Sequence, residues 1–455
     1  MDQAIAVVMA RCLRPGRTNH PAATAVNVAQ PSYEMEEANM SNNEIESVAG
    51  QNQDPLTRRR FIAGAGATAV SLAVLKPQLI GGAEANSKID LGLIGCGGRG
   101  QWIADLFQKH GGYNFVAAAD YFQDKVDAAG EKFHIPADRR FTGLSGYRKL
   151  LEQKLDAIVI ESPPYFHPEQ AAAGVEAGKH VYVSKPIAVD VPGCLTIADS
   201  GKKATAKNLC FLADFQTRAH PSYQEAVRRV HQGDIGRLVC GEATYQCGPT
   251  WGHMDAFLRG KPNDPEARLR AWGIDRVLSG DVITEQNIHA LDVASWMLNA
   301  EPLRAYGIGG QARGFAGTCW DHFAVIFYYP NDVILSFCSK QMGHGYDDIQ
   351  CRMYGTTGTA DTHYFGTVTV RGQDDAYNGG TMTNLFTDGA VRNIATFHHS
   401  ITKGDFTNPT VAASVRSNLT TILGRTASYK RAEVTWEEMM KTSEKLEADF
   451  KGLKG

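Results

Sequence analysis

The sequence predicts an α/β protein with two parts: an N-terminal Rossmann domain with a doubly wound parallel sheet, and a C-terminal α+β domain with a largely antiparallel open sheet. Two observations predict the first part: short apolar segments alternate with helical patterns, and the first apolar segment runs into a glycine-rich turn. One observation predicts the second part: beyond residue 216, several longer strands follow one another with few helices between them. A chain of 455 residues has room for both, and we place the domains at 86–215 and 216–455.

Residues 1–85 differ in composition from the rest of the chain. They begin with a polar stretch without periodicity, which we interpret as disordered, or as an over-long start with Met35 or Met40 as the initiator. A basic cluster and an apolar run follow in LTRRRFIAGAGATAVSLAVL (56–75), and AEA (83–85) has a small-x-small cleavage pattern. This order indicates a twin-arginine-type export signal and a periplasmic location. A short amphipathic helix on a cytoplasmic protein is the alternative.

Composition narrows the classes of function. The formal net charge of -3 gives no electrostatic basis for binding nucleic acid. The body of the chain has no long uncharged apolar stretch, so we expect no membrane span in the mature form. The nine cysteines form no CxxC pair, which favours free thiols over a disulfide framework or a metal cluster.

The glycine-rich turn indicates a dinucleotide site. An apolar strand runs into GCGGRG at 95–100, and a helical pattern follows over 101–110. Gly95 allows the tight turn, Gly97 lets the backbone approach a pyrophosphate at the helix N-terminus, and Gly100 allows close packing of helix and strand.

A second feature specifies the cofactor. The apolar strand at 115–119 ends on Asp120, whose carboxylate can accept hydrogen bonds from ribose hydroxyls and would repel a 2′-phosphate. Tyr121 follows in place of an arginine, so we predict NAD rather than NADP. The structural alternative is that Asp120 caps a helix at 121–131, and the two roles are compatible.

The alternation continues toward residue 213. We predict strands at 157–160, 180–183 and 209–213, and helices at 147–153, 168–177 and 192–206. Ser162, Pro163 and His167 follow the first of these strands, and Lys185 follows the second. Because ligands of such sheets bind at the carboxyl ends of the strands, Lys185 is expected on the cofactor side. Pro186 restricts the backbone of Lys185 and allows a cis bond between them.

The second half contains one chemically informative segment. Strands are predicted at 237–247, 303–311, 322–329, 332–341, 348–354 and 366–371, with a hairpin at 327–332. A helix is predicted over 279–298. Glu285, His289 and Asp292 share one face of it, which is typical of a solvated face, a metal site, or a histidine flanked by carboxylates.

These segments together resemble the glucose–fructose oxidoreductase/inositol dehydrogenase (Gfo/Idh/MocA) family over about residues 88–440. The motifs are GCGGRG (95–100), Asp120, SPPYFH (162–167), AGKHVYVSKPIA (177–188), EQNIHALD (285–292), GTTGTA (355–360) and ILGRTASYKRAEVTWEEM (422–439). The resemblance implies a Rossmann domain, a second domain whose open sheet often forms oligomers, NAD(P), and oxidation or reduction of sugar or cyclitol hydroxyls. It therefore implies a homo-oligomer, a dimer or a tetramer.

The resemblance also implies site residues. The family's lysine falls on Lys185, its carboxylate–histidine pair on Glu285 and His289, and a following aspartate on Asp292. The predicted cofactor-binding residues are Gly95, Gly97, Gly98, Arg99, Gly100, Asp120, Ser162, Pro163, His167 and Lys185.

Three positions depart from the family pattern. Ser184 replaces the glutamate that usually precedes the lysine, so an orienting role of that carboxylate is missing or supplied elsewhere. Glu285 replaces an aspartate, and Pro164 replaces an asparagine near the nicotinamide.

We expect His289 to act as the base, because an imidazole pKa of about 6.5 suits proton transfer. Glu285 would orient it, and Lys185 would stabilise the charge on the reacting oxygen. Taken alone, each has an ordinary interpretation, as a solvated lysine or a satisfied core histidine. Candidate substrate contacts are Arg218, Tyr245, Trp251, His253, Trp272, Asp275, Asn287 and Asp292, with packing against an inserted loop at 249–278 as the alternative.

The leading hypothesis is an NAD-dependent dehydrogenase of a sugar, sugar derivative or cyclitol. One alternative is a glycosidase or lyase that oxidises a glycoside transiently, eliminates the aglycone and recycles NAD. A non-catalytic sugar-binding relative is the third.

Overall fold

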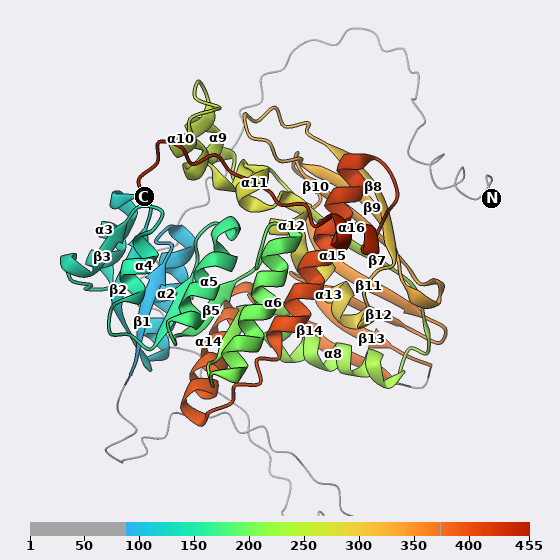
Figure 1. The fold of residues 1–455 in the computed structure, drawn as a ribbon. Coiled ribbons are helices and arrows are strands. Elements are labelled where there is room, and N and C mark those ends of the chain that lie inside the picture. The colour runs from blue at the N-terminus through green and yellow to red at the C-terminus, as the bar shows by residue number, and fades with distance from the viewer. Residues whose placement is uncertain (1–87, 374) are drawn as a thin grey trace, which may run out of the picture. The chain divides into compact units, whose positions relative to one another are not determined.

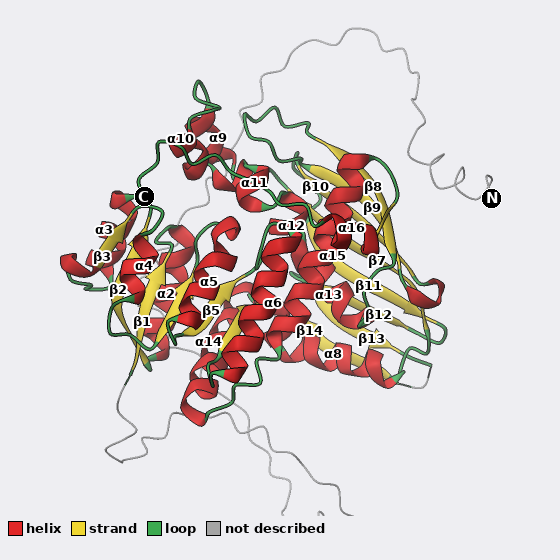
Figure 2. Ribbon diagram, viewed as in Figure 1, coloured by secondary structure: helices red, strands yellow, loops and turns green. Residues whose placement is uncertain are grey.

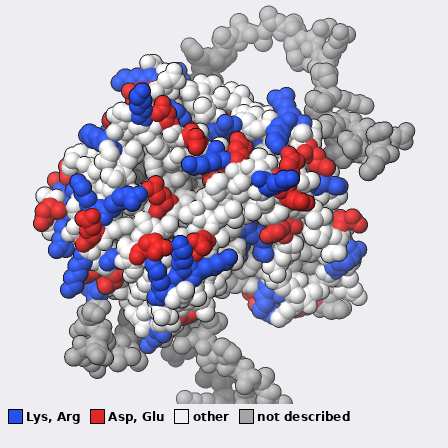
Figure 3. Space-filling model, viewed as in Figure 1, with Lys and Arg blue, Asp and Glu red and all other residues white. Residues whose placement is uncertain are grey.

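The structure is a computed structural model that describes residues 88–373 and 375–455. The predicted leader, export signal and cleavage pattern lie outside these residues. Among the described helices, none combines the length and the apolar character needed to cross a membrane. On the face drawn in Figure 3, the basic and acidic side chains of the described residues are interspersed.

The first sheet is fully parallel and has six strands in the order β3-β2-β1-β4-β5-β6. Its strands are β1 (Ile89–Ile94), β2 (Tyr113–Asp120), β3 (Arg140–Thr142), β4 (Ala157–Ile160), β5 (His180–Ser184) and β6 (Phe211–Asp214). The predicted Rossmann sheet is confirmed, with the short edge strand β3 as an addition. The Lys185–Pro186 bond that follows β5 is cis.

Helices cover both faces of this sheet (Figure 1). One face carries α2 (Gly98–His110), α3 (Gln123–Lys132) and α14 (Leu385–Lys403), and the other carries α4 (Gly146–Leu151), α5 (His167–Glu176) and α6 (Val191–Ala206). Helix α14 comes from late in the chain, yet its Ile394 and Phe397 pack in the same core as Phe107. The segment after the second sheet therefore completes the first layer, which the predicted boundary at 215/216 did not anticipate.

The second sheet has nine strands in the order β14-β13-β12-β11-β7-β10-β9-β8-β15. They are β7 (Leu238–Cys247), β8 (Arg304–Gly310), β9 (His322–Tyr328), β10 (Ile334–Gln341), β11 (Asp348–Gly355), β12 (Thr359–His363), β13 (Thr367–Arg371), β14 (Ala376–Thr381) and β15 (Val434–Thr435). Among these described strands, only the β10–β7 pair is parallel, so the predicted largely antiparallel sheet is confirmed. The predicted hairpin joins β9 to β10 through a short 3-10 turn, Pro330–Asp332.

One face of the second sheet is covered and the other is open (Figure 2). The covering helices are α8 (Pro221–Gln232), α13 (Ile288–Leu298) and α15 (Thr410–Lys430). On the open face, alternate residues of neighbouring strands are exposed and apolar, including Ile308, Ile326 and Ile334.

The remaining described helices are short. They are α7 (Gln216–Ala219), α9 (Asp255–Leu258), α10 (Pro265–Arg270), α11 (Arg276–Ser279), α12 (Val282–Glu285) and α16 (Trp436–Thr442), with 3-10 turns at Ala137–Arg139, Pro164–Phe166, Gly252–Met254 and Trp272–Ile274. Residues 249–278 form an insert with its own small core, which includes Leu258, Ala271 and Ile274.

The continuous helix predicted at 279–298 is wrong. Gly280 and Asp281 both have positive φ, which ends α11, and the Asp281 carboxylate accepts a hydrogen bond from the amide of Val282 at the start of α12. A second break at Gln286 and Asn287 separates α12 from α13. The second break lies between Glu285 and His289, so the two residues belong to different helices.

Candidate functional site

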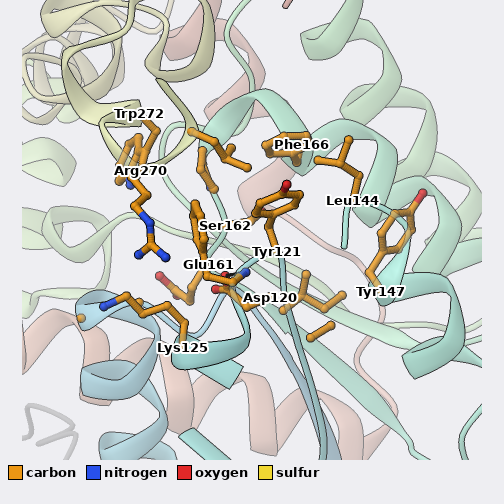
Figure 4. Close-up of a pocket in the computed structure, with 18 of the residues that line it drawn as sticks. Asp120, Tyr121, Lys125, Leu144, Tyr147, Glu161, Ser162, Phe166, Arg270 and Trp272 are labelled. Carbon is orange, nitrogen blue, oxygen red and sulfur yellow. Dashed lines mark hydrogen bonds between the residues drawn. The ribbon is translucent and has the colours of Figure 1, made fainter. Parts of the chain in front are cut away.

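A cavity of about 320 Å³ lies at the carboxyl ends of β1, β2 and β4. Figure 4 shows residues from the first sheet and from the insert pointing into it. Its lining includes Gly95, Gly97, Gly98, Asp120, Tyr121, Phe122, Leu144, Tyr147, Glu161, Ser162, Pro163, Phe166, His253, Met254, Phe257, Arg270 and Trp272. This is the place at which an open α/β sheet binds its ligand.

The four glycines of the turn fall into two groups: two are closely packed against other backbone atoms, and two have open space beside them. A Cβ on Gly95 would lie 2.4 Å from the amide nitrogen of Ser162, and one on Gly100 would lie 1.9 Å from the carbonyl oxygen of Gly95. These two positions must remain glycine for the turn to close. A Cβ on Gly97 or Gly98 would meet no atom of the described residues within 4 Å, and both glycines line the cavity, so a pyrophosphate can reach their backbone.

Asp120 holds the turn and keeps acceptor capacity for a ribose. Its Oδ2 accepts a hydrogen bond of 2.7 Å from the amide of Cys96, and its Oδ1 accepts one of 2.9 Å from the amide of Phe122. Each carboxylate oxygen can accept more than one hydrogen bond, so the predicted ribose contact is compatible with this geometry. The predicted capping of a helix at 121–131 is wrong, because α3 begins at Gln123 with Phe122 at its N-cap and no side-chain cap.

Four predicted cofactor residues do not line the cavity: Arg99, Gly100, His167 and Lys185. His167 is buried, with Nδ1 2.9 Å from the carbonyl oxygen of Pro186 and Nε2 2.7 Å from that of Ser162. Burial lowers its pKa to about 4, so the neutral ring can donate to only one of the two carbonyls. His167 thus ties two loops of the site together instead of facing the cavity.

Lys185, Glu285 and His289, which the family resemblance groups, form a second cluster, and all three are buried. Lys185 Nζ donates to the carbonyl oxygen of Glu285 at 2.6 Å and to its Oε1 at 3.3 Å. The His289 ring contacts the edge of the Tyr364 ring, with centroids 5.3 Å apart. The second carboxylate oxygen of Glu285 and the Tyr364 hydroxyl are buried without a hydrogen-bond partner among the residues that the structure describes.

Burial and nearby charges lower the pKa of both nitrogen bases in this cluster, Lys185 and His289. Burial lowers the pKa of Lys185, Glu285 opposes the shift, and the positive charge of Arg99 adds to it. Burial also lowers the pKa of His289 well below its usual value, and Lys185 and Arg99 act in the same direction. His289 is therefore neutral at pH 7, the state in which imidazole can accept a proton.

Several predicted substrate contacts have other partners. Arg218 and Asp292 form a two-pronged ion pair with distances of 2.8 to 3.0 Å. Asp275 accepts from the Arg268 side chain at 2.7 Å and caps α11 through the amides of Val277 and Leu278. Each of these charged groups is thus held by a partner within the protein.

The remaining candidates divide between two places. Trp272 and His253 line the dinucleotide cavity, and Trp251 packs against Trp272 with ring centroids 5.4 Å apart. Tyr245 donates from its hydroxyl to the Gln286 side chain at 2.6 Å. Asn287, two residues before His289, is fully buried, and within the described part of the chain neither its amide oxygen nor its nitrogen has a hydrogen-bond partner.

The insert forms one wall of the cavity. Arg270 donates to Asp124 of α3 at 3.0 Å, and its guanidinium lies 3.8 Å from the ring centroid of Phe122. In Figure 4, Arg270 and Trp272 enter the cavity from the insert.

Residues 443–455 form a second wall. Phe450 stacks on Phe166, with centroids 5.4 Å apart, and the amide of Leu144 donates to the carbonyl oxygen of Lys454 at 3.0 Å. Phe166 and Leu144 both line the cavity, so this segment packs directly behind its lining.

Two protein-family models match this chain. The family model for an oxidoreductase family with an NAD-binding Rossmann fold matches residues 89–210, and that for a GFO/IDH/MocA C-terminal domain matches residues 223–361. The chain belongs to the Gfo/Idh/MocA family. This Gfo/Idh/MocA protein is accordingly an NAD-binding oxidoreductase acting on CH–OH groups, as the sequence resemblance implied.

Curated relatives include both dehydrogenases and glycosidases. The chain is 26% identical over 286 residues to "Inositol 2-dehydrogenase 2" of Saccharopolyspora erythraea, covering 62% of this chain and 76% of the relative. It is 32% identical over 164 residues to "Alpha-N-acetylgalactosaminidase" of Shewanella oneidensis, covering 34% of this chain and 35% of that relative. The second match thus spans about a third of the relative's length.

Solved structures share the fold of this Gfo/Idh/MocA protein. A levoglucosan dehydrogenase in complex with NADH and levoglucosan aligns with a TM-score of 0.62 and 17% identity, over 77% of this chain and 99% of that one. The myo-inositol 2-dehydrogenase of Lactobacillus plantarum aligns with a TM-score of 0.60 and 20% identity, over the same shares of the two chains.

Sequence reasoning missed Glu161, which lines the cavity and has a fully buried side chain. The signal was present: it directly follows the apolar strand β4, just as Asp120 ends β2. Of the lining from the insert, His253 and Trp272 were predicted only as substrate contacts, and Arg270 had no comparable signal because it comes from a short helix far along the chain.

Proposed function

We propose that the protein is an NAD-dependent dehydrogenase of a sugar, sugar derivative or cyclitol. The observation that carries this proposal is the buried Lys185–Glu285–His289 cluster at the carboxyl edge of the Rossmann sheet. NAD, when bound, supplies the hydride acceptor. The protein's own residues must then hold the substrate hydroxyl, remove its proton and exclude water.

The proton steps follow from the charge states. Neutral His289 accepts the hydroxyl proton, and Lys185 donates a hydrogen bond to the same oxygen while negative charge develops on it. Glu285 fixes the lysine through its carbonyl and its Oε1. Asn287, Tyr364 and the second oxygen of Glu285 provide buried polar atoms that have no partner among the described residues, which suits a ligand with several hydroxyl groups.

The test is NADH formation with a panel of free sugars and cyclitols that includes myo-inositol. We expect accumulation of NADH with at least one of them. Failure of every free sugar and cyclitol, together with cleavage of a glycoside without net NADH, would instead establish the glycosidase.

The NAD-recycling glycosidase is the second candidate, and the walls of the cofactor cavity favour it. The insert and residues 443–455 both pack against the dinucleotide site, which suits a cofactor that stays bound through many turnovers. In that reaction, oxidation of one carbinol acidifies the neighbouring C–H, the aglycone leaves by elimination, water adds, and the stored hydride returns to the carbonyl. Chromogenic aryl glycosides test it directly.

A non-catalytic sugar-binding relative would show neither NADH formation nor cleavage, and the buried basic cluster argues against it.

Two further proposals concern the protein's setting. We propose a homo-oligomer, a dimer or a tetramer, through the open face of the second sheet, where Ile308, Ile326 and Ile334 are exposed. Light scattering of wild type and Ile326→Lys tests this.

We also propose export by the twin-arginine route, and cell fractionation of an Arg58→Lys/Arg59→Lys variant tests it.

A further inference from the structure

We propose that Glu161 supplies the carboxylate that this chain lacks at position 184, and that it is a positioning residue which holds the glycine-rich turn for the cofactor through Arg99. This role depends on the NAD site, which the family establishes, and not on the identity of the substrate.

Strand pairing places Glu161 beside Ser184. Ile160 pairs with Val183, so the next residues of β4 and β5 are neighbours, and Ser184 pairs in turn with Asp214 of β6. The ends of three adjacent parallel strands thus present Glu161, Ser184 and Asp214 in a row. The serine hydroxyl donates to the carbonyl oxygen of Ile160 at 3.3 Å.

Arg99 spans this row. Its Nε lies 3.0 Å from Glu161 Oε2 and its Nη2 lies 2.8 Å from Asp214 Oδ2, and both carboxylates are 0% exposed. Its guanidinium also lies 5.4 Å from the ring centroid of Trp102 and 5.2 Å from that of Phe386. Arg99 belongs to the first turn of α2, so these contacts fix the turn that contains the glycines.

The two carboxylates differ in how well they are satisfied. Asp214 accepts hydrogen bonds from Arg99, from the Gln216 side chain at 2.7 Å and from the Asn393 side chain at 2.8 Å. Glu161 has the ion pair with Arg99 and the nearby Ser184 hydroxyl, but neither of its oxygens receives a hydrogen bond of good geometry from any described residue. A buried carboxylate with so few hydrogen bonds is costly, so its presence beside Asp214 indicates that it holds Arg99 in a way that Asp214 alone does not.

Burial raises the pKa of Glu161 to about 7, with Arg99 and the Ser184 hydroxyl opposing the shift and Asp214 adding to it. Burial raises the pKa of Tyr182, on β5, and the charges of Asp214 and Glu161 add to this shift. Besides burial, the positive charge of Arg99 lowers the pKa of both Lys185 and His289. Glu161 therefore changes charge near neutral pH inside the set of groups that includes the proposed base.

The test exchanges the carboxylate between the two strands. NAD⁺ affinity of the cofactor-free full chain is measured by calorimetry for wild type, Glu161→Ser, Ser184→Glu and the double variant, with melting temperatures alongside. We expect Glu161→Ser to weaken binding at least about 10-fold and the double variant to return within about 3-fold of wild type. Glu176→Gln, which changes an exposed ion-pair partner of Lys203 and Lys207, is the matched control and should bind like wild type.

A double variant that folds and binds as weakly as Glu161→Ser, or a Glu161→Ser variant that binds like wild type, would overturn the proposal. If the double variant does not fold, Glu161→Gln decides, since it keeps the shape and removes the charge. The ionised carboxylate holds Arg99 more strongly, so wild type should gain affinity over Glu161→Gln as the pH rises through about 7. An affinity ratio that does not change with pH contradicts the proposal.

Discussion

Lys185 Nζ lies 2.6 Å from the main-chain carbonyl oxygen of Glu285, closer than it lies to that residue's carboxylate. The lysine from the Rossmann sheet is therefore tethered to the backbone of α12, in the other half of the chain. Because a backbone carbonyl cannot lose its acceptor character, the tether persists whatever the protonation state of Glu285. It fixes the lysine while leaving one carboxylate oxygen available.

Replacing Lys185 by methionine should lower turnover by about 10² to 10⁴, the usual contribution of a proton-transfer or charge-stabilising group. NAD⁺ affinity should stay near that of wild type, because Lys185 does not line the dinucleotide cavity. Steady-state kinetics with the substrate found by the sugar panel, together with NAD⁺ titration, checks both parts. Wild-type turnover in this variant would refute the role of the lysine.

His289→Ala should show a similar loss, and the wild-type pH profile carries a second check. Burial holds the pKa of His289 well below its usual value, so the ring stays neutral where an ordinary imidazole is already taking up a proton. Loss of activity from protonation of this base should therefore occur at a pH well below the ordinary value of about 6.5, not near it. The profile of kcat/KM from about pH 5 to 9 measures it, and an acid limb from His289 centred near its ordinary value would contradict the buried geometry.

The Rossmann half was predictable from the sequence because each of its signals is local. Apolar strands of four to eight residues and the glycine turn are each visible in a short stretch of sequence, and the structure confirms these strands and the helix after the turn. Lys185, Glu285 and His289 were brought together only through the family resemblance, since no periodicity links a strand end to a helix 100 residues later.

The errors came from long-range contacts and from backbone breaks. Nothing local marks α14 as a layer of the first sheet, or the insert and residues 443–455 as walls of the cavity. The prediction of a continuous helix at 279–298 is wrong because Gly280 and Asp281 take positive φ. Tertiary packing here outweighs the local helix propensity. Arg218 and Asp292 were plausible substrate contacts until their mutual pairing was visible.

Glu161→Gln should change how stability depends on pH. The folded carboxyl, with a pKa of about 7, keeps its proton between pH 4.5 and 7, where the unfolded one loses it. Wild-type stability relative to the variant is thus greatest below pH 4.5 and falls as the pH rises through 7. Between about pH 5 and pH 8 the loss amounts to about 2.5 kcal/mol. Urea denaturation of both proteins at the two pH values measures it, and parallel pH curves would exclude a raised pKa.

Asp292→Asn should destabilise the protein by about 3 to 5 kcal/mol, because it leaves the largely buried Arg218 without its counter-ion. Replacing both, with Arg218→Met and Asp292→Leu, should recover a large part of this loss, as expected for a pair whose role is structural. Chemical denaturation gives the free energies of unfolding. A double variant that is stable but has lost substrate affinity would assign the pair to the substrate site after all.

Weakening the walls of the cavity should release the cofactor faster. Arg270→Ala removes both the ion pair with Asp124 and the contact with Phe122, and Phe450→Ala removes the stacking on Phe166. Both walls pack on residues that line the cavity, so each variant should raise the dissociation rate of NADH. The two effects should add, because the contacts are on separate segments. Stopped-flow displacement of NADH by excess NAD⁺ measures the rates.

The control for the cavity walls is Lys430→Ala, which removes an exposed ion pair with Glu438 and should leave the dissociation rate unchanged. If dissociation is already fast in wild type and indifferent to both wall substitutions, the walls do not retain the cofactor. The cavity would then favour an enzyme that exchanges NAD at each turnover, as a net dehydrogenase must, over one that recycles it.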